Sequence, residues 1–332
     1  MVSIRVGLVA DPAAPTDIAE GMADLSPQDG SETWDITVVS EPFTTGSEDV
    51  ETAVGRLQDQ ARHRNWDLVV GLTELPLHDH EGRHLLVETD PERRTAVLSL
   101  PALGGLRMHI RARRAVRSQV SAMADPNTKD EHRVTLPHGH GRWRLLVGMV
   151  LANRPWLLVP GLKSALVAAL ATGAVATINS TVWLLAGSLS WWRLVVATIA
   201  SVALVVAWLV IDGGLWDRPD DDSPQARLYN ASTLVTLMTG VLICYLALCV
   251  VNLAWAFFVL DPAVMGGYLN VSLGYGDLFV LAWFVASAAT VGGGLGSGPE
   301  SDEAIRAATY SKREEDRRDR LARNGNRKRS AR

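Results

Sequence analysis

The chain has 332 residues, of which 48% are hydrophobic and 20% are charged, and its formal net charge is −4. The charge is unevenly distributed, because residues 1–142 contain 15 Lys and Arg against 22 Asp and Glu, whereas residues 300–332 contain 11 against 7. An acidic first part argues against nucleic-acid binding, since phosphates require a cationic face. Both cysteines, Cys244 and Cys249, lie in the second half, so the first part has neither a disulfide framework nor a thiolate zinc site.

Strand and helix patterns alternate through the first 73 residues. Apolar residues recur with period two at 3–10 and at 34–39, which predicts strands. Helical spacing follows each of them, and residues 67–73 form a continuous apolar run that is typical of a strand buried on both faces. Strands separated by helices favour a parallel sheet.

A hairpin and a helix complete this domain. Two strand-like stretches flank the turn at 90–93, and a basic helix extends from Arg107 to about Met123. The order of these elements predicts a soluble α/β domain of three layers over residues 1–125, with a mostly parallel sheet that the hairpin extends. A domain of this length can bury one hydrophobic core.

Polar residues follow the first three predicted strands. Asp11 follows the first strand, Glu41 the second, and Thr73 with Glu74 ends the third. The carboxyl ends of parallel strands lie at one edge of a sheet, where α/β proteins bind ligands, so these four residues are the candidate ligand-binding groups. Turn formation and helix capping are the alternative roles for the same residue types.

A histidine-rich loop is the candidate metal site. His78, His80 and His84 lie within seven residues of one another, and imidazole nitrogens are common ligands of transition metals. No CxxC pair and no helix with two suitably spaced histidines fixes their geometry. We therefore expect no bound metal and no cofactor.

Residues 70–73 (VGLT) and 96–100 (AVLSL) precede the basic helix. This arrangement resembles the front half of archaemetzincin-type zinc peptidases, in which the next helix carries the HExxH motif. Here Arg117, Ser118 and Ser121 stand where that motif would supply its two histidines and its glutamate. The resemblance therefore implies a peptidase-like fold without zinc chemistry.

The second half of the chain contains long runs without a charged side chain, at 164–192, 194–211, 228–260 and 278–298. A helix needs about 20 apolar residues to cross a bilayer core of about 30 Å, and each run can supply one. Helices also satisfy their own backbone groups where water is absent. We therefore predict an all-α domain of four transmembrane helices over residues 163–298. The expected spans are 163–185, 193–211, 231–258 and 278–296.

Basic residues surround these spans asymmetrically. The first and third links contain no Lys or Arg, apart from Arg193 at the edge of the first, whereas the middle link carries Arg218 and Arg227. By the positive-inside rule, this pattern predicts an inner or plasma membrane protein with both termini in the cytoplasm.

Several details of the membrane part stay open at this stage. Residues 126–162 are expected to form a linker with an interfacial helix at 145–158, and a buried helix or a fifth span are its alternatives. Residues 292–294 (GGG) either allow close helix approach or end the last helix. The polar candidates for interhelical hydrogen bonds are Asn179, Ser180, Thr181, Asn252 and Thr290.

The charged tail at 299–332 is expected to be cytosolic and to attract anionic lipid. Lysine makes up 4 of the 32 basic residues, as in GC-rich bacteria, and the chain resembles the four-span membrane proteins with a cytosolic α/β head that occur there. These features predict an integral membrane protein that binds an unidentified protein partner in interaction, sensing or scaffolding, without catalysis. A membrane-anchored enzyme with its site at the carboxyl ends of the head's strands is the alternative, and a small-solute transporter is the third possibility.

Overall fold

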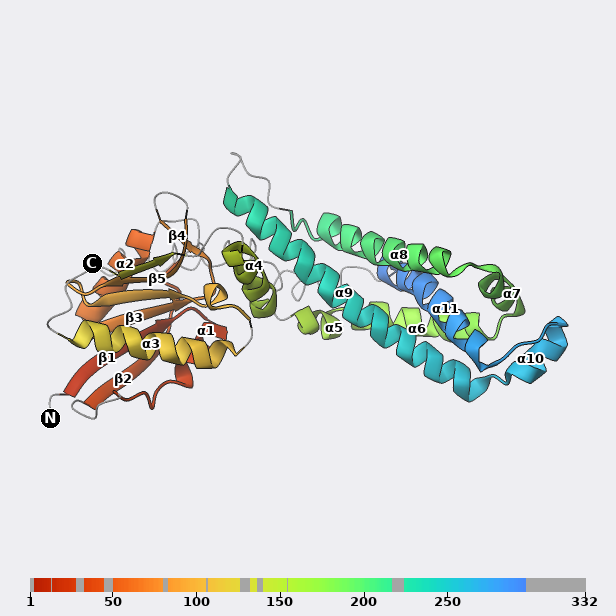
Figure 1. Ribbon diagram of the computed structural model, residues 1–332, viewed down its shortest axis with the longest axis horizontal. Coiled ribbons are helices and arrows are strands. Elements are labelled where there is room, and N and C mark those ends of the chain that lie inside the picture. The colour runs from red at the N-terminus through yellow and green to blue at the C-terminus, as the bar shows by residue number, and fades with distance from the viewer. Residues whose placement is uncertain are drawn as a thin grey trace, which may run out of the picture. The chain divides into compact units, whose positions relative to one another are not determined.

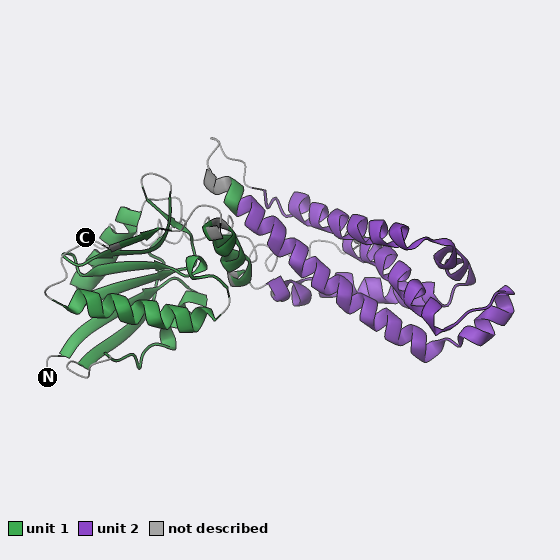
Figure 2. Cartoon of the chain, viewed as in Figure 1, with its two compact units in different colours: residues 1–153, 223–228, 310–332 green, residues 154–222, 229–309 purple. Residues whose placement is uncertain are grey.

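The computed structural model shows a sheet domain and a set of long helices (Figure 1). The residues that it describes are 3–12, 14–27, 33–44, 50–79, 83–105, 107–125, 132–135, 140–153, 155–216 and 224–296. They form two compact units, of which unit 1 consists mainly of residues 1–153 and unit 2 mainly of residues 154–309 (Figure 2). The prediction for the tail at 299–332 falls outside the described residues.

Unit 1 is a mixed α/β domain built on a seven-stranded sheet. The strand order is β2-β1-β3-β6-β5-β4, and β7 pairs with β5. β2, β1, β3 and β6 are parallel to one another, whereas β4, β5 and β7 join the sheet through antiparallel pairs. The expected α/β domain is confirmed, and the short β4 and β7 are additions that periodicity did not predict. The strands are β1 (Ser3–Ala10), β2 (Thr33–Ser40), β3 (Leu68–Thr73), β4 (Leu77–His78), β5 (His84–Asp90), β6 (Thr95–Ser99) and β7 (His132–Thr135).

Helices cover both faces of this sheet. α1 (Ala14–Glu20) and α3 (Met108–Ala124) pack on one face, and α2 (Val50–Arg64) packs on the other. Successive residues of a strand point to opposite faces, so Leu8 of β1 joins the core under α1 and α3 while Val9 joins the core under α2. Unit 1 therefore has three layers with the sheet in the middle.

The helix expected in the linker belongs to unit 1. α4 (His140–Ala152) packs against η1 (Pro101–Leu103), a short 3-10 helix that follows β6, and it buries Leu145 and Met149 completely. The apolar stretch 145–158 is therefore divided between the two units rather than forming one span. α4 has one side buried against η1 and another side exposed, with Trp143 and Val147 on it, and the interfacial role expected for this stretch stays a prediction.

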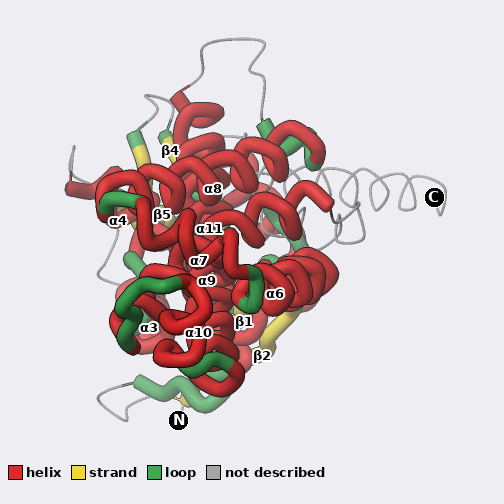
Figure 3. The backbone as a smooth tube through the Cα atoms, turned by 90° about the vertical axis from the view of Figure 1, so that its right-hand side faces the viewer, coloured by secondary structure: helices red, strands yellow, loops and turns green. Residues whose placement is uncertain are grey.

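The described residues of unit 2 form a set of helices (Figures 1 and 3). Among the described residues, α8, α9 and α11 are each long and apolar enough to cross a membrane, and α6 with α7 passes the same test only as a pair. The part of the chain that the structure describes thus has three such helices, or four if the pair forms one span. The elements are η2 (Pro155–Leu157), α5 (Leu158–Gly161), α6 (Lys163–Thr177), α7 (Ser180–Ser188), α8 (Trp191–Asp212), α9 (Pro224–Val259), α10 (Pro262–Leu269) and α11 (Tyr275–Gly296).

The predicted span at 163–185 is wrong as a single continuous helix, because α6 and α7 are bent by 89° at their junction. The Asn179 side chain caps α7 by accepting a hydrogen bond from the Thr181 backbone N–H at 2.9 Å. The indole N–H of Trp183 donates to the Thr177 carbonyl oxygen at 2.8 Å, across the bend. An asparagine cap starts a new helix without a charge or a proline, so the apolar run conceals the break.

Glycines allow α11 to lie close to its neighbours. A Cβ atom on Gly293 would lie 2.5 Å from the Ala165 carbonyl oxygen of α6, and one on Gly294 would lie 2.7 Å from Val205 Cγ2 of α8. Both distances are shorter than any normal contact. Of the two alternatives for residues 292–294, the structure shows close helix approach.

We predict that Gly7→Ala destabilises unit 1 by about 1–3 kcal/mol, the usual effect of overpacking. A Cβ at Gly7 would overlap the indole ring of Trp66, which follows α2 and lies against β1. Gly55→Ala is the matched control, because nothing lies within 4 Å of its Cβ position and alanine favours the helix. Thermal unfolding of the purified protein measures both, and equal midpoints for the two variants would contradict the packing.

A second pair of glycines tests unit 2. Gly293→Ala should lower the thermal stability of the detergent-solubilised protein, because the added methyl group pushes α11 away from α6. Gly292→Ala adds the same group where nothing lies within 4 Å and should leave stability unchanged or slightly higher. A loss of stability in Gly292→Ala equal to that in Gly293→Ala would show that the helix end, and not the contact, is sensitive.

Candidate functional site

The carboxyl edge of the parallel strands holds a buried carboxylate. β1 lies between β2 and β3, and the connections to these neighbours run through α1 on one face and α2 on the other. A topological switch point of this kind is where open α/β sheets bind ligands. Asp11 directly follows β1, Thr73 ends β3, and neither side chain is exposed.

Asp11 and Thr73 bind each other at this switch point. The Thr73 hydroxyl donates to Asp11 Oδ2 at 2.5 Å, and the Phe43 backbone N–H donates to Asp11 Oδ1 at 3.3 Å. The Leu75 backbone N–H in turn donates to Thr73 Oγ1 at 3.0 Å. Both carboxylate oxygens and the hydroxyl group are thus engaged by groups of the chain itself.

The segment after β2 closes over this pair. Phe43 is completely buried against the core under α2, and Arg56 Nη1 donates to its carbonyl oxygen at 3.1 Å. Ser99, which ends β6, donates from its hydroxyl group to the Leu75 carbonyl oxygen at 3.0 Å. These bonds tie the ends of neighbouring strands together at this edge of the sheet.

Glu41 and Glu74, the other predicted groups, have separate environments. Glu41 Oε2 lies 3.5 Å from Arg64 Nη2, so its side chain forms an ion pair at the end of α2. Glu74 is buried beside Thr73 and is 2% exposed. The structure therefore joins Asp11 and Thr73 directly, whereas Glu41 has a different partner.

Two of the three candidate metal-binding histidines are described. His78 of β4 and His84 of β5 lie directly opposite each other in an antiparallel pair, and His80 lies outside the described residues. His78 is 9% exposed, and its Nδ1 has no hydrogen-bond partner among the described residues. No group of three or more His, Cys, Asp or Glu side chains in the described part of the chain has the geometry to hold a metal ion.

The helix that the zinc-peptidase resemblance singles out is α3. Its side toward the sheet is aliphatic and includes Val116 and Val120, both fully buried. Ser118 and Ser121 are exposed, and Arg117 is half-buried. These three side chains do not face the core, so α3 contributes packing to the domain and polar groups to its surface.

A hollow of about 670 Å3 lies at the opposite, amino-terminal edge of the sheet, and sequence reasoning did not find it. At its wall Arg5 donates from Nη2 to Asp67 Oδ1 at 3.2 Å and from its backbone N–H to Asp67 Oδ2 at 2.9 Å. These bonds lower the pKa of Asp67 below its ordinary value and raise that of Arg5. Nε2 of Gln58, in the same wall, is buried without a hydrogen-bond partner among the described residues. Nothing in the periodicity of the sequence signals this hollow, because its wall combines three distant segments.

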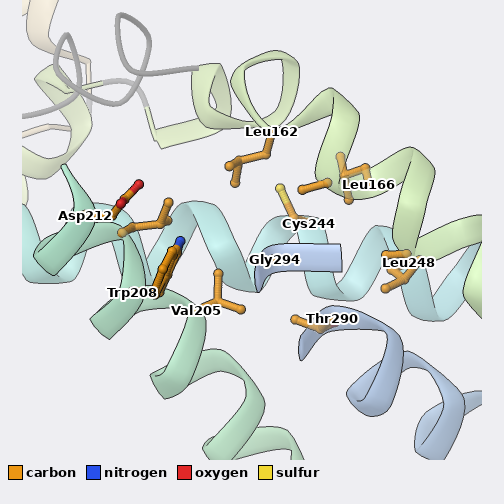
Figure 4. A pocket seen from close by; sticks show the side chains of 12 residues that line it. Leu162, Leu166, Val205, Trp208, Asp212, Cys244, Leu248, Thr290 and Gly294 are labelled. Carbon is orange, nitrogen blue, oxygen red and sulfur yellow. The ribbon is translucent and has the colours of Figure 1, made fainter. Parts of the chain in front are cut away.

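Unit 2 contains a small apolar pocket (Figure 4). Its volume is about 60 Å3, and side chains of α6, α8, α9 and α11 line it, with Cys244, Thr290 and Asp212 among the polar ones. This volume is well below the roughly 150 Å3 of a cavity that admits benzene. Asp212 is the one formally charged residue in the lining, so the pocket has no chain of ionisable groups of the kind that carries ions or protons.

A hydrogen-bonded cluster joins three helices of unit 2. The Tyr245 hydroxyl of α9 lies 2.9 Å from both Thr198 Oγ1 of α8 and Ser287 Oγ of α11. The indole N–H of Trp283 donates to Thr198 Oγ1 at 2.7 Å. None of these four residues was among the polar candidates for interhelical hydrogen bonds.

Two of the predicted polar candidates form hydrogen bonds within their own helices instead of between helices. Asn252 donates to the Leu248 carbonyl oxygen and Thr290 to that of Ala286, each within its own helix. Asn252 also contacts Gly173 of α6, so it contributes to packing between helices.

Comparison with protein-family models, curated proteins and solved structures found no match for this chain. Its function therefore has to be argued from its own geometry.

Proposed function

We propose that the chain is a membrane protein whose α/β head works by binding, in interaction, sensing or scaffolding, and not by catalysis. The main support is the hydrogen bonding of Asp11 and Thr73 at the switch point of the sheet. A catalytic or ligand-binding carboxylate needs an atom directed at the reacting group. Both oxygens of Asp11 accept hydrogen bonds from the chain itself, from Thr73 and Phe43, which supports a structural role for this carboxylate.

The second support is the distribution of reactive groups. Arg117, Ser118 and Ser121 stand where the zinc-peptidase resemblance requires metal ligands and a base, and serine cannot replace an imidazole ligand. Without the zinc site of that family, the head is proposed to act by binding through its surface. The apolar helices of unit 2 then serve as its membrane anchor.

One observation favours the alternative of a membrane-anchored enzyme. Asp11, Thr73 and Glu74 are all buried together at the edge where α/β enzymes place their sites. Buried carboxylates also cluster at functional sites in general. The two functions differ in what Asp11 does for stability, and this difference can be measured.

Under the proposed function, Asp11→Ala should lower the stability of the head by about 2–4 kcal/mol. The substitution leaves the buried Thr73 hydroxyl and Phe43 N–H without their acceptor, and each such loss costs about 1–3 kcal/mol. Thermal unfolding of the full-length protein in detergent measures the change. Glu20→Ala, at an exposed position of α1, is the control and should change stability by less than about 0.5 kcal/mol.

The opposite result would favour the enzyme. Active-site groups are commonly held at the expense of stability, so their removal tends to leave a protein equally or more stable. An Asp11→Ala variant that unfolds at or above the temperature of the unchanged protein would therefore contradict a structural role for this carboxylate.

We also propose that α6 and α7 together cross the membrane, with both termini in the cytoplasm. The support is the absence of Lys and Arg from the first and third links, except Arg193. Reporter fusions after Ser188 and Met265 should then report the outer side, and fusions after Asp221 and Arg332 the cytoplasm. A re-entrant α6–α7 pair leaves three crossings and reverses the result at all four positions if the head stays in the cytoplasm.

A further inference from the structure

Three arginines at the start of α3 are exposed on the side away from the sheet. Ala112 and Val116 of this helix are completely buried, whereas Arg107, Arg111 and Arg114 at its start are exposed. The helix contains no acidic residue between Met108 and Ala124. Its outer side is therefore positively charged although residues 1–142 as a whole are acidic.

Exposed large apolar side chains are rare in unit 1. Among its described residues they are Ile110 on α3, which is 51% exposed, and Trp143 and Val147 on α4, which are 70% and 44% exposed. Trp143 and Val147 are four residues apart and therefore lie on the same side of α4. Apolar side chains that are gathered on one part of a domain mark an interaction surface.

The two helices are joined through one carbonyl group. Arg111 Nη1 of α3 and Arg144 Nη2 of α4 both donate to the Leu103 carbonyl oxygen, at 2.7 and 2.8 Å. In Figure 1 α4 lies near one end of α3, as these bonds require. The α3–α4 surface is defined here as Arg107, Ile110, Arg114, Trp143, Arg144 and Val147.

We propose that the α3–α4 surface docks the head onto an anionic lipid bilayer. Arginine beside tryptophan and aliphatic side chains is the composition of helices that lie in the membrane interface, where the rings occupy the headgroup layer. Charge complementarity selects acidic lipid, because α3 and α4 contain no acidic residue. Ten residues separate Ala152 at the end of α4 from Lys163 at the start of α6, a distance of at most about 35–40 Å when fully extended, so an anchored head always has a bilayer within reach.

This docking goes beyond the proposed function, because it concerns how the head is held and not what it binds. It is also separate from the expected attraction of the tail. The surface uses folded helices with apolar side chains, whereas the tail attraction depends on charge alone.

The test uses the full-length protein in lipid nanodiscs, with Cys244 and Cys249 changed to alanine and a nitroxide label on Val147→Cys. In nanodiscs with acidic lipid, the label should be reached by oxygen and shielded from a water-soluble nickel chelate. In nanodiscs of neutral lipid, or at high salt, it should become accessible to the chelate as the electrostatic attraction is screened. A label on Asp59→Cys, at an exposed position of α2, should be accessible to the chelate in every condition.

Charge variants separate docking from general adhesion. Arg107→Gln with Arg114→Gln should reduce the ratio of docked to undocked head by about 25-fold, since each arginine near an anionic surface contributes about fivefold. Arg62→Gln with Arg94→Gln removes two exposed arginines from the other side of the domain and should leave the ratio unchanged.

Three outcomes would overturn the proposal. The first is a label at position 147 that the chelate reaches in acidic nanodiscs. The second is equal shielding in neutral and acidic lipid. The third is shielding that persists in detergent micelles without acidic lipid, because no anionic bilayer is then present to cover the surface.

Discussion

The arrangement of unit 2 depends on its surface being apolar. Ala169, Gly173 and Gly293 are buried between its helices, whereas Val167 and Phe258 point outward with 67% and 87% of their surface exposed. In water this distribution would be unfavourable. In a bilayer the lipid already supplies an apolar phase, so large side chains gain little by turning inward and close backbone contact becomes the source of packing energy. The hydrogen-bonded cluster around Tyr245 adds directional contacts to that packing.

The sequence predicted the long helices well and their interruptions poorly. The expected spans at 193–211, 231–258 and 278–296 lie within α8, α9 and α11, because absence of charge over about 20 residues is a direct requirement of the bilayer. The break at Asn179 escaped this criterion, since a capping side chain changes helix direction without changing mean hydropathy. The place of α4 in unit 1 was equally hidden. It depends on contact with η1, about 40 residues earlier in the chain, and local apolar pattern does not specify a partner.

In the head, the predicted strand order places Asp11 and Thr73 at one edge of the sheet, but it does not predict their hydrogen bond or the separate ion pair of Glu41. Asp11 and Thr73 are 62 residues apart, and the parallel β1–β3 pair was sufficient to place them at one edge. Phe43 adds to this contact, because its buried backbone N–H donates to the second oxygen of Asp11. That role requires the course of the segment after β2, which has no periodic pattern. The amino-terminal hollow was missed for the same reason, because its wall is assembled from the start of β1, the end of α2 and the turn before β6.

α3 has two sides with different surroundings. Its inner side is determined by the sheet, which requires small and branched aliphatic residues such as Ala112 and Val116. Its outer side has no such requirement, and the exposed Arg107, Arg111 and Arg114 make it positive in a domain of negative net charge. Arg111 donates a hydrogen bond to the Leu103 carbonyl oxygen. Arg113 donates to the Asp24 carboxylate and lowers the pKa of that group. Neither bond explains the exposed Ile110 beside them. An apolar side chain among arginines suits a partner that is both anionic and apolar, and a bilayer interface combines those two properties within a few ångströms.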